Sequence, residues 1–280
     1  MSNLVVRTLS GIVFVALIAG GIIAGPVAFG IVFAGLCAMS LWEFATLLNA
    51  HAGTDINRLI TTVSGAYLFV AFLGYTSGLT SVVVFAPYLL STLYLLVSEL
   101  YLGRPTPLQN WAYAFASHIY VALPFALLCT MAFRETPEGG IAFHYIYPLA
   151  IFIFLWLNDS GAYVFGSLFS RYLPYKLFER ISPKKSWIGS LGGAAVVLAA
   201  AAWLSGHFAM LDLVQWLGLG AVVVVFGTWG DLVESLMKRH FGVKDSGSIM
   251  PGHGGMLDRL DSFLLASPAA AMYLCALVAF

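Results

Sequence analysis

The sequence predicts an all-α, polytopic integral membrane protein of about nine transmembrane helices, with the N-terminus in the cytoplasm and the C-terminus outside. The first observation is composition: of 280 residues, 60% are hydrophobic and only 9% are charged. Soluble domains carry about 25% charged residues, so this chain has too few charges to cover a surface that faces water. The other two observations are the length of its apolar runs and the placement of its basic residues.

The apolar runs are long enough to cross a bilayer, because a transmembrane helix needs about 20 mostly apolar residues. Windows of that length give nine candidate spans, at residues 8–25, 27–48, 58–77, 79–100, 110–133, 146–168, 189–205, 211–231 and 262–280. The first follows Arg7 as the apolar core of a signal peptide would. Further spans follow it without a clear cleavage site, so we expect it to be retained as a helix.

The basic residues test this count independently, because cytoplasmic loops carry an excess of Lys and Arg. With the N-terminus inside and nine alternating spans, 12 of the 13 basic residues fall on the cytoplasmic side and only Arg134 falls outside. A span miscounted in the middle of the chain would destroy this separation. The formal net charge is zero, so the overall charge gives no reason to expect a nucleic acid partner.

The chain divides into two regions of different character. Residues 1–145 hold the N-terminal transmembrane helices 1–5, joined by short loops. Glu43 and Glu99 lie near helix ends there, and we expect them to extend toward the membrane interface. Residues 146–280 hold helices 6–9 with two cytoplasmic loops and most of the ionisable groups, so we expect this C-terminal region to carry the chemistry.

Two segments of the C-terminal region place polar groups where they need an explanation. Asp159 lies inside the sixth span, and a charge at membrane depth is costly and usually functional. Lys184 and Lys185 follow in the next loop, beside Ser182 and Ser186. Lysines in such a loop are by default topology determinants or contacts for anionic lipid headgroups, but with these serines and nearby glycines they also suit a phosphate.

The densest group of charges begins at Asp231. Asp231, Glu234 and Lys238 fall at i, i+3 and i+7, so a continuous helix places them on one face. Asp258 and Asp261 are three residues apart at the start of the ninth span. Carboxylates without His or Cys at ligand spacing suit a hard cation such as Mg²⁺, which commonly bridges carboxylates and substrate phosphates. The residues that could neutralise those phosphates are Lys238, Arg239, Lys244 and Arg259.

A glycine-rich run completes this group. Glycines at 252, 254 and 255, around His253, let the backbone approach a ligand closely and expose its N–H groups. Acids, bases and glycines together predict a metal-dependent site for a polyphosphate. The alternative is a cytoplasmic hairpin whose opposite charges pair only with one another.

These residues resemble a known family. The pattern Ser235-x-x-Lys238-Arg239, Lys244-Asp245, Pro251-x-His253-Gly254-Gly255-x-x-Asp258-Arg259-x-Asp261 is similar to the signature of phosphatidate cytidylyltransferases, also called CDP-diacylglycerol synthases. The segments 158–163 and 182–187 resemble two further family segments in the expected order. One departure is Ile188, where the family usually carries Glu.

The resemblance implies a Mg²⁺-dependent reaction of CTP with phosphatidic acid, giving CDP-diacylglycerol and pyrophosphate for phospholipid biosynthesis. It also implies a multi-pass protein of the cell membrane with its active site facing the cytoplasm and open to membrane lipids, a second cation such as K⁺, and a homodimer. The residues expected to hold metal are Asp231, Asp258, Asp261 and Glu234, and those expected to be catalytic are Asp231, Asp258, Asp261, Lys238 and Arg239. The residues expected to bind substrate are Asp159, Lys184, Lys185, Ser235, Lys244, His253, Gly254, Gly255 and Arg259.

Two other functions remain open at this point. A CTP-dependent lipid kinase of the polyprenol type would use similar groups but release CDP rather than pyrophosphate. A cation-coupled transporter would place charges toward the middle of the bilayer and on both faces, whereas the charges here gather on the predicted cytoplasmic side.

Overall fold

The computed structural model describes residues 3–136, 138–169, 171–172, 174–250, 252 and 254–279. Within these residues, nine helical segments are long and apolar enough to cross a membrane, which confirms the predicted fold class and number of spans. The chain divides into two compact units, described separately below. The first comprises Met1–Pro148 and Phe241–Leu260, and the second comprises Leu149–His240 and Asp261–Phe280.

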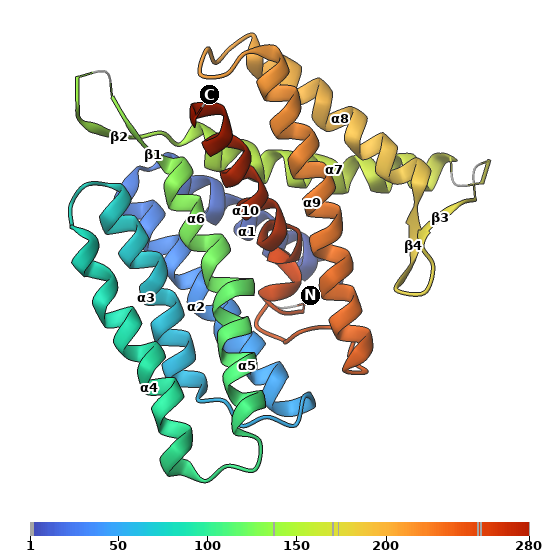
Figure 1. Ribbon diagram of the computed structural model, residues 1–280. Coiled ribbons are helices and arrows are strands. Elements are labelled where there is room, and N and C mark those ends of the chain that lie inside the picture. Colours follow the sequence, from blue (N-terminus) through green and yellow to red (C-terminus); the bar gives the residue numbers. More distant parts are fainter. Residues whose placement is uncertain are drawn as a thin grey trace. The chain divides into compact units, whose positions relative to one another are not determined.

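The first unit is built from the N-terminal helices (Figure 1). They are α1 (Asn3–Ile23), α2 (Pro26–His51), α3 (Arg58–Thr76), the 3₁₀ helix η1 (Val82–Phe85), α4 (Ala86–Leu102), α5 (Pro107–Ser117), the π segment η2 (His118–Ala122) and α6 (Leu123–Ala132). Helix α2 is 26 residues long, which at about 1.5 Å per residue exceeds the roughly 30 Å hydrocarbon layer of a bilayer.

An aromatic cluster forms the core of this unit. The rings of Phe29 and Phe33 lie 4.8 Å apart, and Phe69 and Phe125 contact them from α3 and α6 at 6.0 and 6.3 Å. All four side chains are fully buried. Because apolar side chains gain little by leaving lipid, close packing of this kind supplies much of the association between helices in a membrane.

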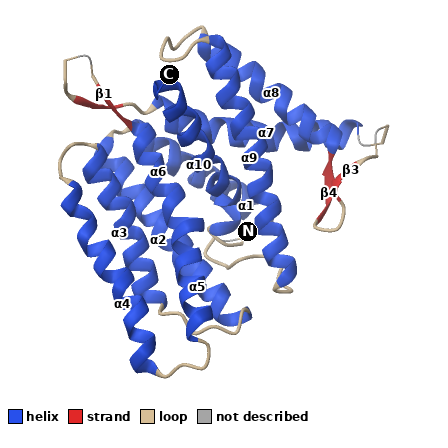
Figure 2. Cartoon of the chain, in the orientation of Figure 1, coloured by secondary structure: helices blue, strands red, loops and turns tan. Residues whose placement is uncertain are grey.

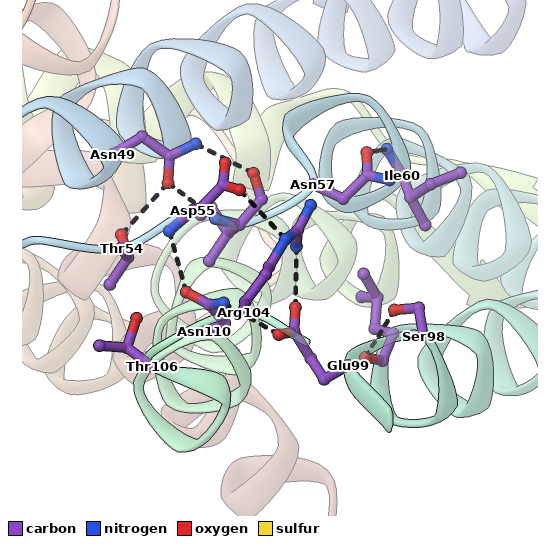
Figure 3. Close-up of polar contacts among 12 residues, drawn as sticks. Asn49, Thr54, Asp55, Asn57, Ile60, Ser98, Glu99, Arg104, Thr106 and Asn110 are labelled. Atoms are coloured by element: carbon purple, nitrogen blue, oxygen red, sulfur yellow. Dashed lines mark hydrogen bonds and ion pairs between the residues drawn. The ribbon is translucent and has the colours of Figure 1, made fainter. Parts of the chain in front are cut away.

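A polar network joins the loops at one end of the first unit (Figure 3). Glu99 accepts hydrogen bonds from Arg104 at 2.8 Å and from the Asn110 amide at 3.0 Å, and Arg104 also pairs with Asp55 at 3.1 Å. Glu99 is only 7% exposed. The prediction that its carboxylate extends toward the membrane interface is therefore wrong, because the network satisfies it inside the protein.

The second unit contains α7 (Ile146–Phe169), α8 (Trp187–Ser205), α9 (Leu213–His240) and most of α10 (Leu257–Ala279). Glycines bring α7 and α8 into backbone contact: a Cβ on Gly161 would lie 2.9 Å from the Cα of Gly193. Helix α8 packs along α9 (Figure 1). The stacked rings of Phe152 and Phe263, with centroids 5.0 Å apart, join α7 to α10.

Two hairpins interrupt the helices (Figure 2). Strands β1 (Phe133–Glu135) and β2 (Ile141–Phe143) pair antiparallel between α6 and α7, and β3 (Lys176–Phe178) and β4 (Ser182–Ser186) pair between α7 and α8. Neither hairpin was expected from the sequence, because each strand is too short to show a clear alternation of apolar and polar residues.

The helix ends also differ from the predicted spans. Helix α9 continues to His240, nine residues past the end of its predicted span, and α10 begins at Leu257, five residues before the predicted start. Hydropathy windows find only the apolar part of a helix, whereas these extensions carry polar residues that lie at the candidate site.

Candidate active site

A cavity of about 610 Å³ lies in the second unit, among α7, the β3–β4 hairpin, α8 and α9. Its volume is within the usual range for small-molecule sites, about 300–1,000 Å³. Two predicted segments meet there, since Asp159 and both Lys184 and Lys185 line it together with Asp231. Hydroxyl groups of Ser186, Ser190 and Thr228 add neutral polar groups to its wall.

The loop that carries the two lysines is fixed by a helix cap. Ser186 is the N-cap of α8, and its Oγ accepts a hydrogen bond from the Gly189 N–H at 3.2 Å. Ser and other short polar residues favour this position because they satisfy an N–H group that has no partner within the helix. A Cβ on Gly189 would lie 2.8 Å from the Ala162 carbonyl oxygen, so glycine at this position lets the start of α8 contact α7.

The two lysines differ in environment. Lys184 is exposed, whereas Lys185 is partly buried and its Nζ lies 2.5 Å from Oδ2 of Asp231. Successive residues of a strand point to opposite faces, so β4 directs only one of the pair to Asp231. The Ser235 hydroxyl donates to the other oxygen of Asp231 at 3.2 Å.

Asp261 belongs to the same group of charges. Its carboxylate interacts electrostatically with Asp231, Asp159 and Lys185. Gly230 allows α9 and α10 to approach, because a Cβ there would lie within 3.0 Å of the Ser262 Cα. Three predicted acidic residues and one predicted lysine are thus brought together in the second unit.

Glu234 and Lys238 form a separate pair on α9. Their side chains make an ion pair four residues apart, with 1% of the Glu234 side chain and 15% of the Lys238 side chain exposed. Arg239, one residue further along α9, is exposed. The proposed metal role of Glu234 and the catalytic roles of Lys238 and Arg239 stay predictions.

The first unit holds the glycine-rich loop. Asp258 Oδ2 accepts hydrogen bonds from the N–H groups of Ser246 and Gly255, at 2.9 and 2.8 Å. Gly254 has a φ of +85°, a conformation that glycine adopts without strain, and its O accepts from the Met250 N–H at 2.9 Å. Lys244 and Arg259 are exposed, and His253 lies outside the described residues.

The contact between Glu43 and this loop was not predicted from the sequence. Glu43, on α2, is 4% exposed. Its carboxylate accepts hydrogen bonds from the Ser246 hydroxyl and from the N–H groups of Met256 and Leu257. It therefore does not extend toward the membrane interface as expected, and the available signal was a carboxylate inside an apolar predicted span.

The donors in the second unit suit a hard cation. Carboxylate oxygens are preferred by Mg²⁺, which is usually held by one or two carboxylates while waters and substrate phosphates complete the shell. Among the described residues, no group of three or more His, Cys, Asp or Glu is arranged to hold a metal ion. Asp231 and Asp261 supply the one or two carboxylates that usually hold Mg²⁺.

An unsatisfied acceptor lies at the cavity wall. Asn158 is 5% exposed, and its Oδ1 has no hydrogen-bond partner among the described residues. Buried polar atoms are almost always bonded, so water or a ligand with an N–H or O–H group is expected to supply the missing donor.

Comparison with known proteins identifies the family of the chain. Residues 5–277 match the model of the cytidylyltransferase family. The chain belongs to this family. The match extends over nearly all of the sequence, so the family accounts for both units described above.

Individual relatives carry a more specific name. The phosphatidate cytidylyltransferase of Staphylococcus aureus strain COL is 33% identical over 266 residues, which cover 94% of this chain and 96% of the relative. The phosphatidate cytidylyltransferases of Staphylococcus haemolyticus and Staphylococcus epidermidis are each 43% identical over 159 residues, 56% of this chain and of each relative.

Proposed function

We propose that this chain transfers the cytidylyl group of CTP to phosphatidic acid, giving CDP-diacylglycerol and pyrophosphate. Full-length similarity to relatives with the name phosphatidate cytidylyltransferase supports this reaction. The observation that carries the proposal is the cavity of about 610 Å³ in which Lys184, Lys185, Asp159 and Asp231 come together. Lysines can neutralise the phosphates of a nucleoside triphosphate, and carboxylates can hold the cation that accompanies it.

In the proposed reaction, an oxygen of the phosphatidate phosphate attacks the α-phosphorus of CTP. The new O–P bond forms as the bond between the α-phosphorus and the bridging oxygen breaks, and pyrophosphate leaves with that electron pair. Because the attacking phosphate is already an anion, no side chain is needed to remove a proton from it. The protein's task is to align the two substrates and neutralise charge.

Lys185 would serve that task. Its ammonium lies beside the Asp231 carboxylate, and a strongly charged phosphate competes well for the same group. Lys184 extends from the neighbouring position into more open surroundings, where it would attract the substrate phosphates. The hydroxyl groups of Ser190 and Thr228 would donate hydrogen bonds to phosphate oxygens.

Asp231 and Asp261 are the residues that we propose hold Mg²⁺. When bound, the ion would neutralise phosphate oxygens and so make the α-phosphorus more electrophilic. The Asp231 carboxylate itself would also orient Lys185. The K⁺ ion and the homodimer implied by the sequence resemblance stay predictions.

We also propose that the site faces the cytoplasm in the cell membrane. CTP is a charged solute that does not cross a bilayer, and the loop 170–186 falls on the cytoplasmic side of the predicted topology, with five of its residues basic. The lipid substrate would reach the same level from the membrane, where its phosphate lies at the interface.

Product analysis of the purified protein in detergent tests this proposal. With CTP, phosphatidic acid and Mg²⁺, we expect pyrophosphate and CDP-diacylglycerol to form in equal amounts, and neither to form when the lipid or Mg²⁺ is omitted. Release of CDP on addition of prenol or diacylglycerol, without pyrophosphate, would instead identify a CTP-dependent lipid kinase and refute the proposal.

A further inference from the structure

Glu43 lies far from the charged segments in sequence but contacts the loop that carries them. It is the eighteenth residue of α2 by position in Pro26–His51, inside an apolar span. Its hydrogen-bond partners are Ser246, Met256 and Leu257, more than 200 residues along the chain. All of these residues belong to the first unit.

The contacts of Glu43 fix both ends of the glycine-rich loop, residues 244–257. At one end, Oε1 accepts from the Ser246 hydroxyl. At the other, Oε2 accepts from the Met256 N–H at 2.9 Å and Oε1 from the Leu257 N–H at 3.1 Å. The Glu43 side chain therefore links Ser246 to Leu257, which are separated by ten residues of the chain.

The glycines of the loop fit closely against this carboxylate. A Cβ on Gly247 would lie 2.5 Å from Oε2 of Glu43, and a Cβ on Gly255 would overlap Oε1. With Glu43 in this position, a larger residue at 247 or 255 would displace its carboxylate.

Glu43 also caps α10, which begins at Leu257. The first N–H groups of a helix have no partner within it, and a negative charge at that end is favourable. This cap lets α10 begin early enough to include Asp258, whose Oδ2 in turn binds the N–H groups of Ser246 and Gly255. Glu43 and Asp258 thus both bond to the loop.

We propose that Glu43 is a positioning residue for the cytidylyl transfer, holding the loop 244–257 and the start of α10 in the conformation that the reaction needs. This inference rests on the proposed function. The Glu43 carboxylate bonds to the loop, so its loss would disturb the alignment of Asp258 and its neighbours. A displacement of about 1 Å can lower a rate about 100-fold, and loss of supporting residues commonly lowers activity 10- to 100-fold.

The test compares Glu43→Gln with Glu99→Gln. If the glutamine oxygen replaces Oε1, its NH₂ group faces the Met256 N–H, so two donors oppose each other at the same volume. Glu99 is a matched control because it is also a buried glutamate of the first unit, bonded to Arg104 and Asn110. We expect Glu43→Gln to lower kcat about 100-fold with KM for CTP changed less than threefold, and Glu99→Gln to keep kcat per folded molecule within twofold.

A second measurement reads the loop directly. Hydrogen exchange followed by mass spectrometry should show faster exchange in peptides covering 244–258 for Glu43→Gln, and no change there for Glu99→Gln. Adding Ser246→Ala to Glu43→Gln should lower kcat less than twofold further, because the two residues act through one contact.

The inference would be overturned by a Glu43→Gln enzyme within threefold of the wild-type kcat, or by a loop that exchanges no faster than in the wild type. Equal losses of activity in the two variants, in proportion to their thermal stability, would also overturn it. If the wild-type protein makes no CDP-diacylglycerol, the proposed function fails instead, and the exchange comparison still decides whether Glu43 holds the loop.

Discussion

Replacing Lys185 with methionine separates a role in catalysis from a role in folding. Methionine keeps most of the volume and the unbranched shape of the side chain but removes the ammonium that lies 2.5 Å from Asp231. The variant should fold normally and react slowly, because the charge is needed where phosphates bind and is dispensable for packing.

The effects of Lys185→Met on stability and on kcat differ in size. The Lys185 and Asp231 side chains are 25% and 29% exposed, and partly exposed ion pairs contribute only about 0–1 kcal/mol to stability. A charge that stabilises a phosphoryl-type transition state in a closed site is worth about 3–4 kcal/mol. At 1.36 kcal/mol per factor of ten, this corresponds to a fall in kcat of about 100- to 1,000-fold with almost unchanged thermal unfolding.

The assay is the rate of pyrophosphate release in detergent with saturating CTP and phosphatidic acid, with thermal unfolding measured on the same samples. Arg180→Gln is the control, since Arg180 is an exposed basic residue in the turn between β3 and β4 that does not line the cavity. It should keep wild-type activity. A Lys185→Met enzyme within threefold of wild type, or one whose activity falls only as far as its stability does, would contradict the reasoning.

Three further perturbations test the fold and its orientation. Gly193→Ala places a Cβ 2.6 Å from the Asn158 carbonyl oxygen, so thermal unfolding should show a loss of stability of about 1–3 kcal/mol from overpacking. The control is Gly206→Ala, whose Cβ would have its nearest neighbour at 3.6 Å; this change should alter stability by less than about 0.5 kcal/mol. Arg104→Met leaves the buried carboxylate of Glu99 without its cation. It should destabilise the protein by about 3 kcal/mol without changing kcat per folded molecule. Stability equal to wild type would show that the network in Figure 3 is not needed for stability. In a Cys275→Ser background, a membrane-impermeant maleimide applied to intact cells should label Glu138→Cys but reach Glu179→Cys only after the membrane is opened, and the reverse pattern would invert the predicted topology.

The membrane fold could be predicted because hydropathy and charge are properties of local sequence. Each span needs about 20 apolar residues whatever its neighbours are, so the nine windows match the nine helical segments of the described residues that are long and apolar enough to span a membrane. The ends of helices depend on partners elsewhere in the chain. The start of α10 at Leu257 is one example, because the carboxylate that caps it is more than 200 residues away.

The site was predictable in its residue types and less so in its contacts. Spacing on α9 grouped Asp231 with Glu234, yet Asp231 pairs with Lys185 while Glu234 pairs with Lys238. Sequence could not distinguish Lys184 from Lys185 either, because the choice depends on which face of β4 each residue occupies. Glu43 was misread for the same reason, since only the folded chain places the loop 244–257 beside α2.

The destination of the α-phosphorus of CTP tests the central claim most directly. Purified protein would be incubated with Mg²⁺, with phosphatidic acid or, in parallel, a prenol or diacylglycerol as the lipid, and with CTP labelled at either the α- or the γ-phosphate, and the lipid fraction would then be counted. We predict that the α-label enters the lipid and that the γ-label leaves as pyrophosphate. Transfer of the γ-label to lipid, with the α-label remaining in CDP, would show that the protein is a kinase and contradict this account.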